Sequence, residues 1–128
     1  MKLTTRDVVT LYDIIGKIAE RQDLNTAPVD VKFLLVRNAR AVQDIWAEFM
    51  QARQTLLMEN SRPVENSENR QATQEQLDYI NKEIAKLEKV EVEVAITPIS
   101  LSKLEALNLD IIEMNGLYPI IANEEALY

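Results

Sequence analysis

The residues with the clearest potential for chemistry are Glu91 and Glu93, which belong to an alternating stretch, Val-Glu-Val-Glu-Val-Ala-Ile, at residues 90–96. On a β-strand both carboxylates would lie on one face, where they could bind an oxygen-preferring cation or act as an acid/base pair. Alternating glutamates on an exposed strand face also keep a protein in solution and protect an open edge. We favour this second interpretation.

Other catalytic arrangements lack essential parts. The chain has no histidine and no cysteine, so the usual general base at neutral pH, the thiol nucleophile and the commonest zinc ligands are missing. Ser100 and Ser102 have no base to activate them, and no glycine-rich loop could hold a phosphate. We therefore predict a protein that is not an enzyme, with no catalytic residue, no metal ligand and no cofactor.

Nucleic-acid binding is also disfavoured. The best candidates for it are four cations on one predicted helix: Lys32, Arg37, Arg40 and Arg53. Acidic residues are interleaved with these cations, and the formal net charge is −7. The net charge is +1 for residues 1–58 and −4 for each of 59–93 and 94–128. Since binding to a phosphate backbone needs a basic face, we expect no nucleic-acid partner.

Helical periodicity governs the first part of the chain. A motif resembling a capping box at residues 4–7 precedes apolar residues at helical spacing and predicts a helix over 5–21. Gly16 inside this helix would cost about 1 kcal/mol relative to alanine unless a neighbouring helix packs closely there. The low glycine content and the abundance of leucine, alanine, glutamate and glutamine favour helix throughout.

A second, longer helix is predicted over residues 30–59, about 40 Å long. Its apolar seam follows a 3-4 spacing: Leu35, Asn38, Val42, Ile45, Phe49, Ala52 and Leu56. The polar residues 60–72 predict a mobile loop, and a capping box at 73–76 opens a helix over 73–89. We therefore expect an antiparallel helical hairpin with a long coiled-coil-like arm.

Two features of the long helix are candidates for protein interaction. Asn38 falls on the seam, where a buried amide can fix register or oligomeric state, although it could instead be half exposed near the helix start. Trp46, Phe49 and Met50 form an apolar cluster that we assign to the hairpin core rather than to a binding anchor.

Residues 90–96 form the only convincing strand, with Val90, Val92, Val94 and Ile96 on its apolar face. One strand cannot satisfy its own main-chain groups. The candidate partners are residues 2–4, residues 118–122 or the same strand of another subunit. If no segment of this chain pairs with it, the strand is a binding site.

The C-terminal region, residues 102–128, predicts two short helices and a docked tail. Capping boxes at 102–105 and 110–113 would open the helices, and Asn115-Gly116 would stop the second one. No apolar run approaches the roughly 20 residues of a membrane span. The fold class is therefore mainly α, in a single domain of residues 1–128.

The layout resembles a family of small tailed-bacteriophage proteins that has no established function. The resemblance rests on four stretches in order: Met1-Lys2-Leu3-Thr4, Glu91-Val92-Glu93-Val94, Ile99-Ser100-Leu101-Ser102-Lys103-Leu104-Glu105 and Leu109-Asp110-Ile111-Ile112. Relatives tend to carry an Asp-His-Lys-like run after the Glu-Val alternation, where this chain has Ala-Ile-Thr-Pro at 95–98. No site that uses this histidine is expected here.

The resemblance implies a bacteriophage origin. Together with the absence of catalytic groups, it leads us to expect a structural or assembly component of the virion, with copies of itself or other phage proteins as partners and with no small-molecule substrate or membrane. Its expected location is the host cytoplasm during infection, or the virion. The alternative is a small acidic inhibitor of a host defence or nucleic-acid enzyme, whose carboxylates would imitate phosphates.

Overall fold

The structure is a computed structural model that describes residues 1–21 and 26–121. It is mainly helical, as predicted, with the expected helical hairpin, N-terminal helix, small β element and short C-terminal helices. The elements in chain order are β1 (Lys2–Thr4), α1 (Thr5–Ala19), α2 (Val29–Glu59), β2 (Arg62–Pro63), β3 (Arg70–Gln71), α3 (Gln74–Glu88), β4 (Glu91–Glu93), α4 (Leu101–Glu105), α5 (Ile111–Gly116) and the 3-10 helix η2 (Tyr118–Ile120).

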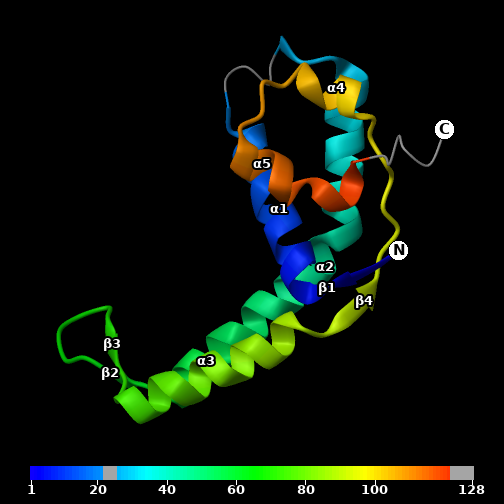
Figure 1. Cartoon of the computed structure of the whole chain (residues 1–128). Helices are drawn as coiled ribbons and strands as arrows, with labels where there is room; N and C mark the ends of the chain where they lie inside the picture. Colours follow the sequence, from blue (N-terminus) through cyan, green and yellow to red (C-terminus); the bar gives the residue numbers. More distant parts are fainter. Residues whose placement is uncertain (22–25, 122–128) are drawn as a thin grey trace.

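The elements form a body and a projecting arm (Figure 1). The body holds α1, the first part of α2, the β1–β4 pair and the C-terminal helices, and the arm consists of the second part of α2 together with α3. The core lies in the body, and most of its members come from α1, α2 and the segment that follows β4: Val8, Leu11, Ile15, Ile18, Val31, Leu35, Val42, Val94, Ile99, Leu104, Leu117 and Ile120.

The predicted coiled-coil arm is shorter than the apolar seam of α2 suggested. Val31, Leu35 and Val42 are buried in the body, and only the second part of α2 runs beside α3 (Figure 1). A 3-4 repeat requires a partner along one face of a helix but does not say which helix supplies it. Here α1 covers the first part of the seam, and α3 covers the rest.

Local capping explains where three helices begin. The Thr4 side chain accepts a hydrogen bond from the main-chain N–H of Asp7 at the start of α1. Thr73 with Gln76, and Asp110 with Glu113, each form the complete reciprocal capping box. These boxes satisfy main-chain N–H groups that have no partner inside the helix. The predictions at these three positions are confirmed.

The capping box predicted at Ser102 and Glu105 is wrong. The N-cap of helix α4 is Ser100, two residues before the predicted cap, and no side chain caps the helix. Lys103 of this helix forms an exposed ion pair with Asp30 at the start of α2, in which Nζ lies 3.1 Å from Oδ2. The hydrogen bond from Lys103 lowers the pKa of Asp30 below its ordinary value.

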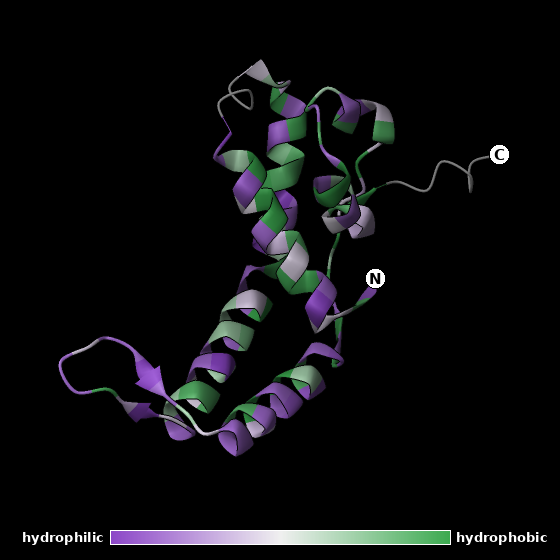
Figure 2. Cartoon of the chain, turned by 60° about the vertical axis from the view of Figure 1, so that its left-hand side comes forward, coloured by the Kyte–Doolittle hydropathy of each residue, from purple (hydrophilic) through white to green (hydrophobic). Residues whose placement is uncertain are grey.

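The polar segment at 60–72 is a small antiparallel ribbon of β2 and β3 rather than a plain loop. The Arg70 guanidinium holds it to the end of α2 by donating to Ser61 Oγ at 2.6 Å, Ser61 O at 2.9 Å and Met58 O at 3.3 Å. Asn66 adopts a positive φ of 60° at the turn, which asparagine tolerates well. Figure 2 shows that this end of the arm is largely hydrophilic.

The two glycines have opposite surroundings. A Cβ at Gly16 would meet no atom within 4 Å, so no neighbouring helix requires glycine there. A Cβ at Gly116 would lie 2.4 Å from Cγ1 of Ile14. As predicted, α5 ends at Gly116, although this residue has no positive φ and forms no left-handed cap. Its function in the fold is to let α5 approach α1 closely.

Substitution of each glycine by alanine should therefore change stability in opposite directions. Gly116→Ala should lower the free energy of unfolding by about 1–3 kcal/mol, because the added methyl overpacks the contact with Ile14. Gly16→Ala should raise it by up to about 1 kcal/mol through helix propensity. Urea unfolding monitored by circular dichroism measures both values, and a neutral Gly116→Ala would contradict the close α1–α5 packing.

Candidate protein-binding surfaces

The strand predicted over residues 90–96 is shorter than expected, and it has a partner in this chain. Strand β4 pairs antiparallel with β1, which places Leu3 opposite Val92. The pairing continues past the strand, because Thr5 donates to Val90 O from both its main-chain N and its Oγ1, each at 2.8 Å. The stretch therefore joins the beginning of the chain to the base of the arm.

Its apolar residues do not form one exposed surface. Val94 is buried in the core, Val92 and Ile96 are half buried against it, and Val90 is exposed. The face that we proposed as a binding surface is mostly packed on the body of this chain. Of the other candidate partner, residues 118–122, the described residues 118–121 do not pair with β4, and Ala122 lies outside the described residues. Ile121 forms an isolated parallel bridge with Ile99.

The outer edge of β4 carries the two glutamates. Because hydrogen-bonded and non-hydrogen-bonded pairs alternate in an antiparallel ladder, the main-chain groups of Glu91 and Glu93 point away from β1. Both side chains are exposed, which agrees with a role in protecting the edge. Among residues 1–21 and 26–121 no group of three or more acidic side chains could hold a metal ion.

Asn38 is fully buried and acts as a latch within the chain. Its Nδ2 donates to Leu34 O at 2.9 Å and to Thr97 O at 2.8 Å, while its Oδ1 accepts from the main-chain N–H of Thr97 at 2.8 Å. The amide thus pairs with both main-chain groups of Thr97, as a neighbouring strand would. The expected buried asparagine is present, but it fastens the segment after β4 rather than a second helix.

The aromatic residues of α2 serve two separate contacts. The Trp46 ring stacks on Tyr12 of α1 with centroids 4.5 Å apart, and its Nε1 donates to Asp13 Oδ1 at 3.1 Å. Trp46 therefore packs against α1 and lies outside the hairpin core. Phe49 is buried where α2 leaves the body. Of the predicted site residues, Phe49, Val90 and Val92 line one small cleft of about 190 Å³.

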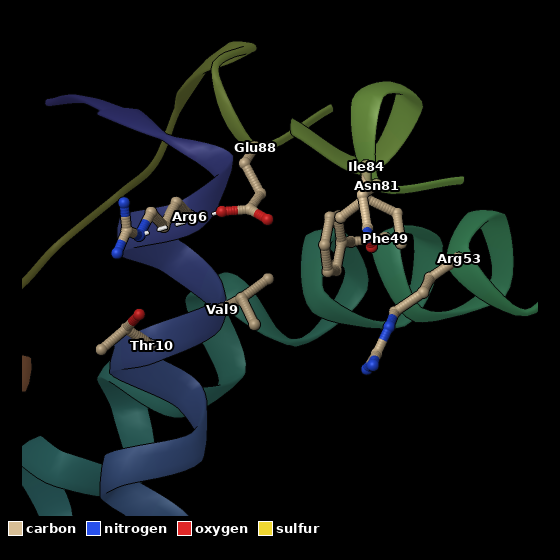
Figure 3. A pocket seen from close by; sticks show the side chains of 8 residues that line it. All are labelled: Arg6, Val9, Thr10, Phe49, Arg53, Asn81, Ile84 and Glu88. Atoms are coloured by element: carbon tan, nitrogen blue, oxygen red, sulfur yellow. Dashed lines mark ion pairs between the residues drawn. The ribbon is translucent and has the colours of Figure 1, made fainter. Parts of the chain in front are cut away.

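A larger cleft of about 330 Å³ separates α1 from the arm (Figure 3). The side chains that line it come from α1, α2 and α3: Arg6, Val9, Thr10, Phe49, Arg53, Asn81, Ile84 and Glu88. Its single carboxylate, Glu88, lies 3.8 Å from Nε of Arg6, and its single hydroxyl belongs to Thr10. This set contains no activated nucleophile and no acid/base pair.

The outer face of α2 exposes a second apolar row, which we call the α2 stripe: Val29, Phe33 and Val36. These side chains are 80%, 63% and 48% exposed. Their i, i+4, i+7 spacing puts them opposite the buried seam of the same helix. With Lys32, Arg37 and Arg40 they line a shallow depression of about 550 Å³ whose described lining holds no acidic side chain. Our sequence interpretation followed one seam and missed this second repeat.

Three further exposed apolar side chains, which we call the α5 patch, lie on α5 and on the 3-10 helix that follows it: Ile111, Ile112 and Tyr118. These side chains are 79%, 67% and 77% exposed. The adjacent pair Ile111-Ile112 could have revealed this patch in the sequence. Successive helical residues point in different directions, so a helix that packs on one side cannot bury both of them equally. Both residues were predicted to lie on a short helix, but their exposure was not predicted.

A buried ion pair holds α5 in place. Arg21 Nη1 lies 2.8 Å from Glu113 Oε1, and Arg21 Nη2 donates to the carbonyls of Leu107 and Asn108. Glu113 is buried, and in the described part of the chain its Oε2 has no hydrogen-bond partner. The α5 patch thus stands on a helix that is fixed against the end of α1.

Comparisons of the chain with protein-family profiles, curated proteins and solved structures found no match. Among the described residues no helix is both long enough and apolar enough to cross a membrane.

Proposed function

We propose that this chain is a non-enzymatic protein that acts by binding other proteins, as a structural or assembly component of a bacteriophage particle. The observation that carries the proposal is the α2 stripe. Helix α2 has two apolar faces, and within residues 1–21 and 26–121 only one of them is covered. Contiguous apolar residues exposed in this way on a folded protein mark interaction sites more often than scattered single ones do.

The energetics favour a protein partner. Complete burial of a valine or phenylalanine side chain contributes about 1.5–3 kcal/mol, so covering Val29, Phe33 and Val36 would offset a substantial part of the cost of association. The flanking cations would orient the partner and raise the rate of encounter. A catalytic role has less support, because the clefts described above contain no reactive pair.

The arm supports an assembly role. It extends away from the body (Figures 1 and 2), and it exposes Met58, Leu77 and Tyr79 near the end of α2 and along α3. A projecting hairpin can reach a neighbouring subunit without disturbing the core of either protein. The phage assignment itself is supported by the resemblance in layout.

The alternative of an acidic inhibitor has less support. A mimic of nucleic acid needs a continuous acidic face. On the arm and at its base, carboxylates alternate with cations and pair with them, as in Glu83 with Lys86 at 3.1 Å and Glu88 with Arg6. The exposed arm is therefore mixed in charge.

Quantitative mass spectrometry of purified particles tests the proposal. Both mature particles and assembly precursors of the phage that encodes the chain should be purified, washed in high salt and digested. We expect a fixed copy number per particle in at least one of the two preparations. Absence from both preparations, or loss of all copies in the wash, would contradict the structural or assembly role.

A further inference from the structure

We infer that the α2 stripe of one copy binds the α5 patch of a second copy, so that the chain assembles head to tail. This inference rests on the proposed function, since it names the partner for a surface already assigned to protein binding. The contact joins two different surfaces and is therefore heterologous. After two copies bind, one of them has an unoccupied stripe and the other has an unoccupied patch. The same contact can therefore repeat, which produces a ring or a filament.

The exposure of the apolar side chains supports this contact. The five most exposed large apolar side chains in the described part of the chain are Val29, Ile111, Tyr118, Ile112 and Phe33. All five fall in the two surfaces, and the sixth member, Val36, adjoins Phe33 on the stripe. The stripe and the patch stand on different helices that both pack against α1. They are thus separate surfaces of the body, and each needs an apolar cover.

The charges around the two surfaces also support this contact. The stripe is flanked by Lys32, Arg37 and Arg40. Residues 104–121, which include the patch, contain three acidic residues and no lysine or arginine. Arg21, which follows the end of α1, comes close to the patch, but it is paired with Glu113. Asp110, which directly precedes Ile111, is exposed and gives the patch a negative charge.

Charge also selects the arrangement. Two stripes in contact would bring the Arg37 and Arg40 side chains of both copies together, and two patches in contact would bring two copies of Asp110 together. Like charges placed opposite each other cost free energy and suppress such pairings. When the stripe of one copy contacts the patch of another, apolar residues pack against apolar residues and opposite charges lie near each other. The shallow depression along α2 can receive the first turn of the short helix α5.

Two single substitutions and their mixture test this arrangement. Phe33→Asp removes the stripe and keeps the patch, whereas Ile111→Arg removes the patch and keeps the stripe. Both side chains are exposed, so both variants should fold, which circular dichroism and thermal unfolding will verify. Val64→Asp, at an exposed apolar position on the arm, is the matched control.

Multi-angle light scattering of the full chain should show a mass that rises with protein concentration and falls with added salt. Each stripe or patch variant alone should have the mass of one 14.7 kDa chain, and Val64→Asp should assemble like the wild type. An equimolar mixture of Phe33→Asp and Ile111→Arg should form a complex of two chains and grow no further, because its one productive contact leaves no intact surface.

Other outcomes would overturn the inference. A wild-type chain that remains monomeric from micromolar to millimolar concentration excludes self-assembly. Loss of assembly in Phe33→Asp alone, with no complex in the mixture, would show a contact between two stripes. Assembly that neither substitution affects would use another surface. A monomeric chain that is present in the particles would contradict head-to-tail assembly and leave the proposed function intact. A chain that assembles but is absent from the particles would contradict the proposed function and leave head-to-tail assembly intact.

Discussion

Replacement of Asn38 by alanine is expected to lower the free energy of unfolding by about 2–4 kcal/mol. The substitution leaves the main-chain N–H and C=O of Thr97 without their partner, and each buried group left in this state costs about 1–3 kcal/mol. Thr97 is half buried, so water can compensate part of this loss. A cavity next to Val42 and Leu35 adds to the cost.

Urea unfolding at equilibrium measures this effect, and hydrogen exchange locates it. Residues 94–99 should exchange faster in Asn38→Ala than in the wild type, because the latch to α2 is lost. Gln43→Ala, at an exposed position of the same helix, should change stability by less than about 0.5 kcal/mol. Asn38→Asp keeps an acceptor for Thr97 but loses the donor, and it should be destabilised as well. A loss below 1 kcal/mol in Asn38→Ala would show that the amide is not a structural latch.

Replacement of Phe49 by alanine is expected to cost about 3 kcal/mol, within the range for a buried phenylalanine. Phe49 is shared by the clefts on both sides of the point where α2 leaves the body. Its removal should enlarge both clefts and weaken the attachment of α3. Hydrogen exchange should therefore rise more along the arm than in α1, while urea unfolding reports the total loss.

Phe33→Ala supplies the matched control, because it makes the same chemical change on the same helix at an exposed position. Its stability should stay within about 0.5 kcal/mol of the wild type, while its self-association should weaken. If Phe49→Ala were as stable as Phe33→Ala, Phe49 would not be a structural residue, and its earlier candidacy as a binding residue would regain support. Phe49→Ala and Phe33→Ala together therefore distinguish a structural residue from a binding residue on the same helix.

Sequence alone was sufficient for the features that depend on neighbouring residues. The capping boxes at Thr73 and Asp110 were predicted correctly because the groups that form them lie three residues apart. The five α-helices of the described residues were predicted at approximately the right positions, because an apolar stripe and its interruptions are properties of one segment, whereas the 3-10 helix η2 was not predicted. The same motif at Ser102 failed, because the helix there begins at Leu101 with Ser100 as its N-cap.

Tertiary structure decided which surfaces remained available. The alternating strand was found from its period of two, but nothing in residues 90–96 indicated that β1 would pair with it. Asn38 was located on a seam, and its real partner, Thr97, stands 59 residues away. Trp46 was assigned to the arm, although Tyr12 of α1 stacks on it.

The location of the candidate binding surface also depended on the tertiary structure. From the sequence we placed it on Val90, Val92, Val94 and Ile96, whereas the fold packs most of that face into its own core and leaves the stripe on α2 and the patch on α5 uncovered. By itself the sequence determined that the chain is helical, acidic and without histidine or cysteine. Periodicity reveals that a face is apolar, because that property is local. Only the three-dimensional arrangement decided which apolar faces this chain buries and which it leaves for a partner, because burial depends on contacts between residues far apart in the chain.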